Sequence, residues 1–526
     1  MENVYPYNFE IAASLVLLVL GYLSSVIIYR LTLHPLANYP GPFFAKVTDL
    51  YSVYQAWTGR RHINFWELHQ RYGDTVRFGP NDISLNSNTA LPQLYLDKKS
   101  TKKSKFYTIF PSSANIFNMR DKQVHGRMKK ILAQAFSEQA LRGIQPYVFD
   151  EISLFCERMV AYTASDDNKW SIAMNVGRWT NYMTYDVLGS VCYGRSFRTL
   201  VEDSNRYIVD LINGVTAPNY TFGQMPVLSK FGLASPLFRG RMKQVIRFVR
   251  FGNALFAERE KAGANTGRRD FFYYLFTAKD PDTGEVLKSG ELAEQSRGFL
   301  IAGADTTSVA FASCFFYLLH NPVTLFKLTS EIRSRFAKVE DIEPGSEFSS
   351  CLYLHACVDE AMRLSPPVPT GPPREVLAGG ITIDGIHYPE GTVLSVPTYV
   401  IQRSEKYFAE PEAFKPERWI AESANYQTEK SRVSETIALA KSAYFPFSLG
   451  ARKCLGQRFA TMQLTVALAR IVWLYDLRLA VDQHEAKEPN DERTQISSKT
   501  EPEYPLHDRL IAVKNGPVVQ FKPREA

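Results

Sequence analysis

The stretch FPFSLGARKCLGQRF, residues 445–459, constrains this chain more than any other segment of similar length. It places Cys454 between Gly450 and Gly456, with Arg452 two residues before the cysteine. Glycines allow tight turns in which amide groups can point at sulfur, and the helical pattern that follows would direct its positive N-terminal end toward it. This setting favours a thiolate that ligates the metal of a large planar cofactor over an ordinary buried cysteine near a turn.

The remaining cysteines indicate neither a second metal site nor a disulfide framework. They form no Cys-x-x-Cys pair and no zinc-type spacing, which in a chain of 526 residues fits a reducing compartment. We expect five ordinary buried thiols, at Cys156, Cys192, Cys314, Cys351 and Cys357.

The N-terminal region carries an uncharged apolar run over residues 11–29. As a helix this run would be about 28 Å long, close to the ~30 Å hydrocarbon core of a bilayer. Lys and Arg follow the run but do not precede it, a bias that leaves the bulk of the chain on the cytosolic side. A cleaved signal peptide is disfavoured, because no basic segment comes first and the run is too long. We expect a membrane anchor over residues 1–30.

The segment after the anchor is rich in proline. HPLANYPGP, residues 34–42, holds three prolines and favours an extended, stiff connector. We assign residues 31–45 to this connector. Residues 46–526 are assigned to one large domain, because no Gly/Ser-rich or Pro-rich linker divides them.

The large domain is expected to be mostly α with small β-sheets. Apolar residues recur at helical spacing over 120–335 and again after Cys454. Residues 74–86 alternate and break at Gly-Pro, as a short hairpin does. Residues 365–400 combine Pro, Gly and β-branched residues, which is typical of turns and short strands.

Three further segments carry local predictions. Residues 509–521 place Lys-Asn-Gly-Pro between two apolar runs, which is a hairpin signal. Residues 421–441 and 483–504 are polar and aperiodic, so we expect both to be surface loops.

The cysteine segment resembles the haem-binding loop of the cytochrome P-450 superfamily. Phe447, Gly450, Arg452, Cys454 and Gly456 match its pattern F-x-x-G-x-R-x-C-x-G. The resemblance implies haem b as cofactor, with Cys454 as the axial ligand of the haem iron and the other four residues shaping the loop. It also implies the cytochrome P-450 fold, preceded here by one transmembrane helix.

A second segment of the resemblance is FLIAGADTTSVAFASCFF, which contains Ala302, Gly303, Asp305 and Thr306. Glycine inside a helix costs up to ~1 kcal/mol against alanine, and close approach of a flat ligand is one reason to keep it. In the family this helix crosses the haem face opposite the cysteine, which implies cofactor contact by Ala302 and Gly303. The pair Asp305 and Thr306 would then manage protons as catalytic residues. A packing notch of small residues is the alternative.

A third segment is Glu360-Ala-Met-Arg363, whose spacing places both charges on one helix face. It resembles the family's E-x-x-R pair, which an arginine from a later segment joins, here Arg418 in Pro-Glu-Arg-Trp. The resemblance implies a buried network with a structural role for all three residues.

Groups for the haem propionates follow from the same resemblance. Arg374 occupies the position of the family's strand arginine, and Arg452 of the cysteine loop would also pair with a propionate. His125 and Lys129 occupy helix positions where the family commonly has Trp or His and then Arg. Lys129 departs from that pattern: it supplies charge without a bidentate fork.

The resemblance implies a monooxygenase that uses O2 and NADPH. No P-loop, dinucleotide fingerprint or flavin module is visible, so electrons would come from a separate NADPH–cytochrome P-450 reductase. The net charge of +7 fits an acidic partner or an anionic membrane surface. No nucleic acid partner is expected, since no basic run alternates with aromatic residues. A basic docking patch is predicted at Arg127, Lys129, Lys130, Lys453 and Arg458.

The anchor and connector resemble the microsomal members from filamentous fungi, many of which tailor secondary metabolites such as polyketides and terpenoids. This implies an endoplasmic reticulum membrane protein, in contact with membrane lipid, that acts on an apolar small molecule. Candidate pocket walls are Phe106, Tyr107, Ile109, Phe110, Ile116, Phe117, Leu300, Ala302 and Val368.

Other functions stay open at this point. Within the hydroxylases, a xenobiotic or an aromatic acid is an alternative substrate. Outside them, the chain could be a haem-thiolate isomerase or dehydratase, or a membrane haem protein without enzymatic activity. The retained Asp305 and Thr306 and the basic residues favour the monooxygenase.

Overall fold

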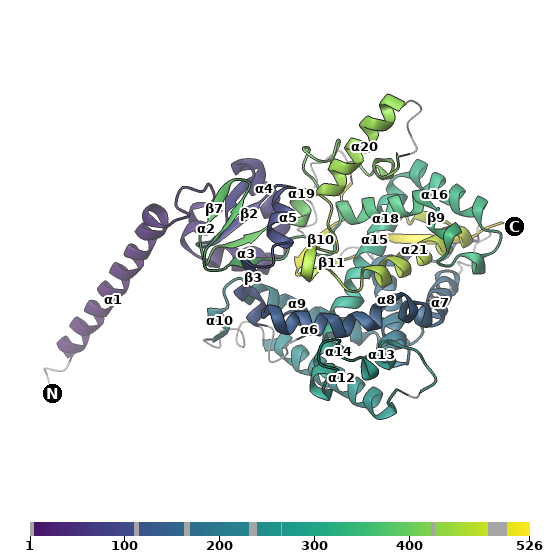
Figure 1. Cartoon of the computed structure of the whole chain (residues 1–526), viewed down its shortest axis with the longest axis horizontal. Coiled ribbons are helices and arrows are strands. Elements are labelled where there is room, and N and C mark those ends of the chain that lie inside the picture. The colour runs from purple at the N-terminus through teal and green to yellow at the C-terminus, as the bar shows by residue number, and fades with distance from the viewer. Residues whose placement is uncertain are drawn as a thin grey trace.

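The computed structural model describes residues 5–109, 115–161, 169–230, 239–264, 266–421, 427–481 and 502–525. Helices dominate it, and a small sheet-rich part lies between the N-terminal helix and the helical body (Figure 1). This arrangement confirms the mostly α fold with small sheets. The helices that position the site are α6 (Lys122–Leu132), α7 (Glu138–Val160), α8 (Val176–Tyr193), α14 (Ser289–Gly303), α15 (Asp305–His320), α18 (Leu352–Leu364) and α21 (Gln457–Leu474).

Other helices complete the described body. They are α2 (Phe43–Val47), α3 (Leu50–Thr58), α4 (Arg61–Tyr72), α5 (Ala90–Tyr95), α9 (Tyr207–Gly223), α10 (Val227–Lys230), α12 (Arg239–Ala262), α13 (Phe271–Thr277), α16 (Pro322–Arg335), α17 (Ser346–Ser349), α19 (Thr398–Ile401) and α20 (Gln427–Ser442).

The largest sheet has the strand order β1-β2-β8-β5-β3. Its strands are β1 (Thr75–Arg77), β2 (Asp82–Leu85), β8 (Val393–Ser395), β5 (Arg374–Val376) and β3 (Thr101–Lys103). The antiparallel β1–β2 pair confirms the hairpin predicted over 74–86. Antiparallel pairing of β3 with β5 sets Lys103 directly opposite Arg374.

The C-terminal hairpin prediction is wrong. β11 (Ile511–Lys514) pairs with β10 (Leu506–Arg509), whereas β12 (Val518–Pro523) lies between β4 (Met174–Asn175) and β9 (Tyr475–Leu479). Asn175 explains the separation. Its side chain donates to Asn515 and accepts from the Gly516 amide, and these contacts hold the intervening turn at β4.

Two segments predicted to be surface loops have different outcomes. Residues 427–442 form helix α20, so the loop prediction over 421–441 is wrong for most of its length. Of the second segment, 483–501 lie outside the described residues. The short strands β6 (Ile381–Ile383) and β7 (Ile386–Tyr388), together with β5 and β8, confirm the strands predicted over 365–400.

The N-terminal helix α1 (Tyr5–Ile28) projects away from the body (Figure 1). The stretch Glu10–Leu33 is long and apolar enough to cross a bilayer, and none of it is buried by protein. A second stretch of that kind, Ser289–His320, is 67% buried and forms the core helices α14 and α15. The first stretch is therefore compatible with a single-pass anchor.

Residues 35–38 form turns, so the segment 34–42 is not the continuous extended rod that its prolines suggest. Arg77 organises these turns because its fully buried side chain donates to the carbonyl oxygens of Arg30 and Leu36, at 2.9 and 3.1 Å. The Arg77 amide donates to the carbonyl of Pro40. The segment after the helix is thus fixed to the largest sheet.

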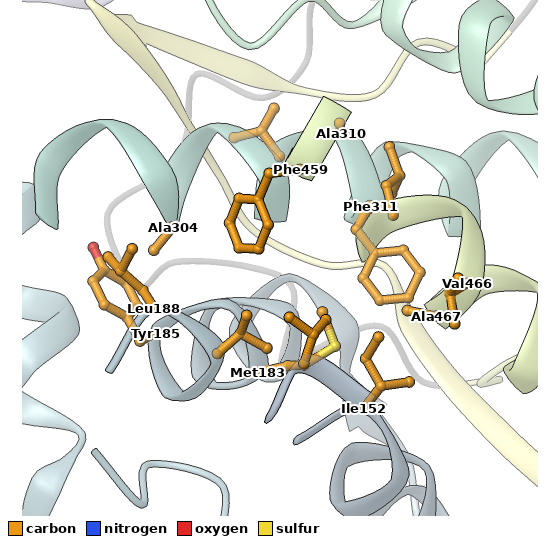
Figure 2. Packing of buried hydrophobic residues seen from close by; sticks show 14 of the residues in the cluster. Ile152, Met183, Tyr185, Leu188, Ala304, Ala310, Phe311, Phe459, Val466 and Ala467 are labelled. Atoms are coloured by element: carbon orange, nitrogen blue, oxygen red, sulfur yellow. The ribbon is translucent and has the colours of Figure 1, made fainter. Parts of the chain in front are cut away.

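The main core lies among α7, α8, α15 and α21. Figure 2 shows Ile152, Tyr185, Phe311 and Ala467, one from each helix, facing a common interior. All four side chains are completely or almost completely buried. This packing holds the start of α15 and the start of α21 within one rigid unit.

Candidate active site

The cysteine loop is built on a glycine that no other residue can replace. Gly450 has a φ of +68°, and an added Cβ would lie 2.3 Å from the carbonyl oxygen of Tyr95. The loop then returns on itself, since the Cys454 amide donates to the carbonyl of Phe447 at 2.9 Å. Helix α21 begins at Gln457, so Cys454 lies just before a helix N-terminus, as predicted.

The sulfur of Cys454 differs from the other five thiols. Cys454 is exposed, whereas Cys156, Cys192, Cys314, Cys351 and Cys357 are buried. Surrounding protein raises the pKa of the Cys454 thiol. The amides of Gly456 and Gln457, with Lys129 and Lys453, oppose that rise. Backbone donors and positive charge therefore oppose the effect of the surrounding protein at Cys454, although the pKa of its thiol stays raised, and a bound metal ion would favour the thiolate.

Two cations tie this loop to the region of α6. Lys129 donates to the carbonyl oxygen of Ala451 at 2.6 Å. Arg452 donates in the opposite direction, to the carbonyl of Met119 at 2.7 Å and more weakly to those of Arg120 and Asp121. Both residues therefore stabilise the loop itself, a task that the sequence did not indicate for Lys129.

Sequence reasoning missed one cation of this region, Lys103. Its side chain is buried, donates to the carbonyl of Phe117, and lies 4.4 Å from the ring centroid of Tyr107. Burial, then Arg374 and Arg452, hold the pKa of Lys103 well below its usual range. Only the pairing of β3 with β5 brings Lys103 to this site, and no local sequence pattern predicts that pairing.

The cations around Lys103 repel one another. Burial and then Arg374 lower the pKa of Arg452 to about 10. Burial, followed by Arg452, Lys103, Lys129 and Arg374, lowers the pKa of His125 to about 3, so this imidazole is neutral at pH 7. Within the described part of the chain, none of these five side chains forms an ion pair with a carboxylate.

This donor set fits haem. Buried cations without carboxylate partners are costly, and a ligand that brings carboxylates would remove that cost. Haem b carries two propionate carboxylates and an iron that accepts a thiolate. Arg374, Arg452, Lys103, His125 and Lys129 suit the first, and Cys454 suits the second.

The predicted oxygen-side helix is interrupted at Ala304, between α14 and α15. Ala302 is exposed although Leu300 and Ala304 are fully buried, so one face of the helix is not covered by protein. Thr306 donates its hydroxyl hydrogen to the Ala302 carbonyl at 2.8 Å. The glycine at position 303 has an explanation other than cofactor contact, since a Cβ added there would lie 3.0 Å from the Leu188 side chain.

Asp305 opens α15 and is 5% exposed. Its Oδ1 accepts a hydrogen bond from the hydroxyl of Tyr185 at 2.9 Å. Burial raises the pKa of Asp305 to about 6, against the opposing effects of Lys514 and Tyr185. Sequence reasoning missed both of these partners, because they come from α8 and β11.

The predicted structural triad is assembled. Arg363 donates to both oxygens of Glu360 at 2.8 and 2.9 Å, and Arg418 donates to Oε1 of Glu360 at 2.9 Å. Arg363 also donates to the carbonyls of Gln402, Pro411 and Ala413. The pKa of Glu360 is lowered: burial opposes ionisation, but the two arginines outweigh it.

Three of the five residues predicted for the basic docking patch lie beside carboxylates, and the patch itself stays a prediction. Arg127 pairs with Asp280, Glu285 and Glu291, because the segment after α13 folds back against α6. Lys130 pairs with Asp282, and Arg458 pairs with Glu138. In the described structure Lys129 and Lys453 form no ion pair, so the positive charge of this face is much reduced.

The residues predicted to line the substrate pocket differ in their burial. Phe106, Tyr107 and Leu300 are buried, whereas Phe117 is 39% exposed. Ile116 and Val368 are partly buried, and Ala302 is exposed. Phe110 lies outside the described residues, as does the side chain of Ile109.

Comparison with known proteins agrees with this geometry. The family model for cytochrome P450 matches residues 36–506. Cytochrome P450 monooxygenase AKT7 of Alternaria alternata is 33% identical over 506 residues, which cover 96% of each chain. Cytochrome P450 monooxygenase poxM of Penicillium oxalicum is 31% identical over 502 residues, 95% of this chain and 93% of poxM. Cytochrome P450 monooxygenase apf7 of Gibberella fujikuroi is 33% identical over 521 residues, 95% of this chain and 96% of apf7.

The match spans nearly the whole chain, and members of this family hold haem b by a cysteine thiolate. The chain belongs to the cytochrome P450 family and is a monooxygenase.

Proposed function

We propose that this protein is a membrane-anchored monooxygenase that inserts one oxygen atom into an apolar small molecule of fungal secondary metabolism. The observation that carries the proposal is the exposed Cys454 at the start of α21, beside Lys103, a buried amine that forms no ion pair with a carboxylate in the described part of the chain. The balanced reaction is RH + O2 + NADPH + H+ → ROH + H2O + NADP+.

Haem, when bound, supplies the activation of O2 and the oxygen transfer. Cys454 would hold the iron as a thiolate, and the Gly456 and Gln457 amides oppose the rise in its thiol pKa. Arg374, Arg452 and Lys103 would neutralise the propionates, and His125 and Lys129 would support them. The apolar residues beside α14 exclude water from the reacting bond.

Proton handling is assigned to the start of α15. The Thr306 hydroxyl donates to the Ala302 carbonyl at 2.8 Å, on the face that protein leaves uncovered. Asp305 follows the helix break, and its pKa of about 6 leaves a mixture of acid and carboxylate near neutral pH. A carboxyl group with that pKa can accept and return protons at a useful rate.

The apolar substrate is inferred from the side chains near this face. Phe106, Tyr107 and Phe117 contact one another edge to face, at centroid distances of 5.1 and 5.5 Å. The relatives named above come from filamentous fungi, which fits a polyketide or terpenoid substrate better than a xenobiotic or a simple aromatic acid.

Electrons are assigned to a separate NADPH–cytochrome P-450 reductase. The exposed Lys453 and its neighbour Lys129 remain as positive groups beside the cysteine loop, and an acidic protein surface would complement them. This is a smaller patch than the sequence indicated.

The location is assigned to the endoplasmic reticulum membrane, with the large domain in the cytosol. Apolar side chains continue from α1 onto α2 and α3, where Phe43, Phe44, Leu50, Tyr54 and Trp57 are each more than half exposed. Exposed aromatic rings beside a membrane span suit the lipid headgroup region. Protease added to sealed microsomes should therefore digest the large domain.

The test is spectroscopic and then catalytic. The reduced, CO-bound protein is expected to show the red-shifted Soret band of thiolate-ligated haem. Cys454→Ala should lose the band, and Cys156→Ala should keep it. With reductase present, NADPH consumption coupled to oxygen insertion excludes an isomerase, a dehydratase and a haem carrier. A retained band in Cys454→Ala would overturn the assignment of the ligand.

A further inference from the structure

A small polar cluster lies between α8, α15 and the end of β11, and its residues Asn181 and Lys514 are partly buried. The amine of Lys514 donates to Oδ1 of Asn181 at 2.7 Å and to Oγ of Ser308 at 2.9 Å. Ser308 donates to the main-chain oxygen of Asp305 at 3.1 Å. The cluster thus connects the C-terminal strand to the first turn of α15.

The same two helices hold Asp305 from the other side. Tyr185 lies one helical turn after Asn181 on α8, and its hydroxyl donates to the Asp305 carboxyl. Figure 2 shows Tyr185 and Leu188 beside Ala304, among apolar side chains. In this setting a charged amine must be compensated by hydrogen bonds and by an opposite charge.

The charges that face one another are few. For Lys514 the acid is Asp305, which favours the charged amine, while burial lowers the pKa of Lys514 to about 8. For Asp305 the groups are Lys514 and Tyr185. For Tyr185 a more distant carboxyl, Asp210 on α9, adds to the effect of Asp305. Lys514 is therefore the cation that favours ionisation of Asp305.

We propose that Lys514 is a positioning residue for Asp305, holding that carboxylate ionised and seated on Tyr185 at the break between α14 and α15. Asn181 and Ser308 fix the amine, and Ser308 also fixes the first turn of α15. Removal of the positive charge leaves Asp305 protonated at neutral pH. This inference rests on the proposed function, because it assigns Asp305 to proton handling beside Thr306.

The cluster also explains why the acid is retained at a buried position. The N-terminal end of α15 favours a carboxylate, but burial opposes one. Lys514 opposes the effect of burial from a strand far away in the sequence, and the pKa of Asp305 stays raised, at about 6. Ser308, on the same helix as Asp305, holds the amine, so the ionisation of Asp305 depends on the placement of the β10–β11 hairpin against α15.

The experiment measures the ionisation of Asp305 directly. Infrared difference spectra of the haem-loaded protein are recorded against pH, and the carboxyl band lost in Asp305→Asn is assigned to Asp305. In Lys514→Met the midpoint is expected to rise by about 1–3 pH units. Lys514→Arg should stay near the wild type, and Lys522→Met, a surface lysine of β12, should not change it.

Ser308→Ala is the second variant, should Lys514→Met fail to fold. It removes one of the two hydrogen bonds that hold the amine and leaves the bond to Asn181 and the charge in place, so a smaller rise in the same direction is expected. A midpoint unchanged in both variants overturns the proposal.

The catalytic readout is peroxide released per NADPH consumed with reductase present. The ratio should increase in Lys514→Met and recover in Lys514→Arg, and an unchanged ratio also counts against the proposal. Failure of the proposed function is distinguishable, because it would abolish the thiolate band in the wild type and leave the infrared titration intact.

Discussion

Two groups of buried cations in this molecule are compensated in opposite ways. Arg363 and Arg418 share the carboxylate of Glu360, and main-chain oxygens take their remaining hydrogens. Lys103 and Arg374, in contrast, lie opposite each other on β3 and β5 and have carbonyl oxygens and aromatic rings as neighbours. The first group is complete with protein alone, whereas the second is completed by an anionic ligand.

The difference separates a structural role from a binding role. A paired buried ion network contributes to the fold whether or not a cofactor is bound. A buried cation without a carboxylate destabilises the free protein, and an anionic ligand that pairs with it binds more tightly for that reason. A substitution in the first group should therefore lower the unfolding free energy of both the free and the haem-loaded protein. A substitution in the second group should raise the unfolding free energy of the free protein and weaken haem binding.

The largest effect is expected for Glu360→Gln. Loss of this charge leaves Arg363 buried without its carboxylate, which costs about 3–5 kcal/mol. Urea unfolding should show the loss in the free and the haem-loaded protein alike. Glu410→Gln, at an exposed pair with Lys415, serves as the control and should show little change. A loss confined to the haem-loaded protein would remove the distinction between the groups.

Lys103→Met is expected to stabilise the free protein and to weaken haem binding. The free protein should gain about 1–3 kcal/mol of unfolding free energy, because an uncompensated buried charge is removed. Haem should at the same time transfer faster to an acceptor protein. Lys102→Met is the control, since Lys102, the neighbour of Lys103 in β3, pairs with Glu375 near the surface. Destabilisation of the free protein by Lys103→Met would contradict the comparison.

The pH dependence of the unfolding free energy of the free protein tests the same comparison. His125 has a folded pKa of about 3, below its unfolded value, so its contribution to stability is present above about pH 6.5 and is lost as the pH falls toward 3. Between pH 7 and 5 this contribution should fall by about 1–2 kcal/mol. His125→Gln should remove this part of the slope. Haem propionates raise the folded pKa, so the slope of the loaded protein should be shallower; equal slopes would count against propionates beside His125.

The smallest effect is expected for Lys129→Met. Lys129 donates to the Ala451 carbonyl, so the free protein should lose about 1 kcal/mol where Lys103→Met gains. The two lysines are compared by urea unfolding under one set of conditions. A gain in unfolding free energy in both variants would place Lys129 in the same group as Lys103 and Arg374.

Sequence reasoning identified the parts of the site that depend on local spacing. The glycine, arginine and cysteine of one loop, and the Glu360–Arg363 pair of one helix turn, are separated by a few residues each. Lys103, Tyr185 and Lys514 could not be found in this way, because strand pairing and helix packing bring them in from distant segments. The acids beside the predicted docking patch were missed for the same reason: those that pair with Arg127 follow it by more than a hundred residues.

Arg77 has a consequence for how the enzyme meets a partner in the same membrane. Its guanidinium holds carbonyl oxygens from both sides of the joint, those of Arg30 and Leu36 before it and that of Pro80 in the turn between β1 and β2. With α1 in a bilayer, these contacts would limit how far the large domain swings about the joint. A partner protein anchored in the same bilayer would then meet a narrower range of orientations, which raises the effective concentration of productive encounters.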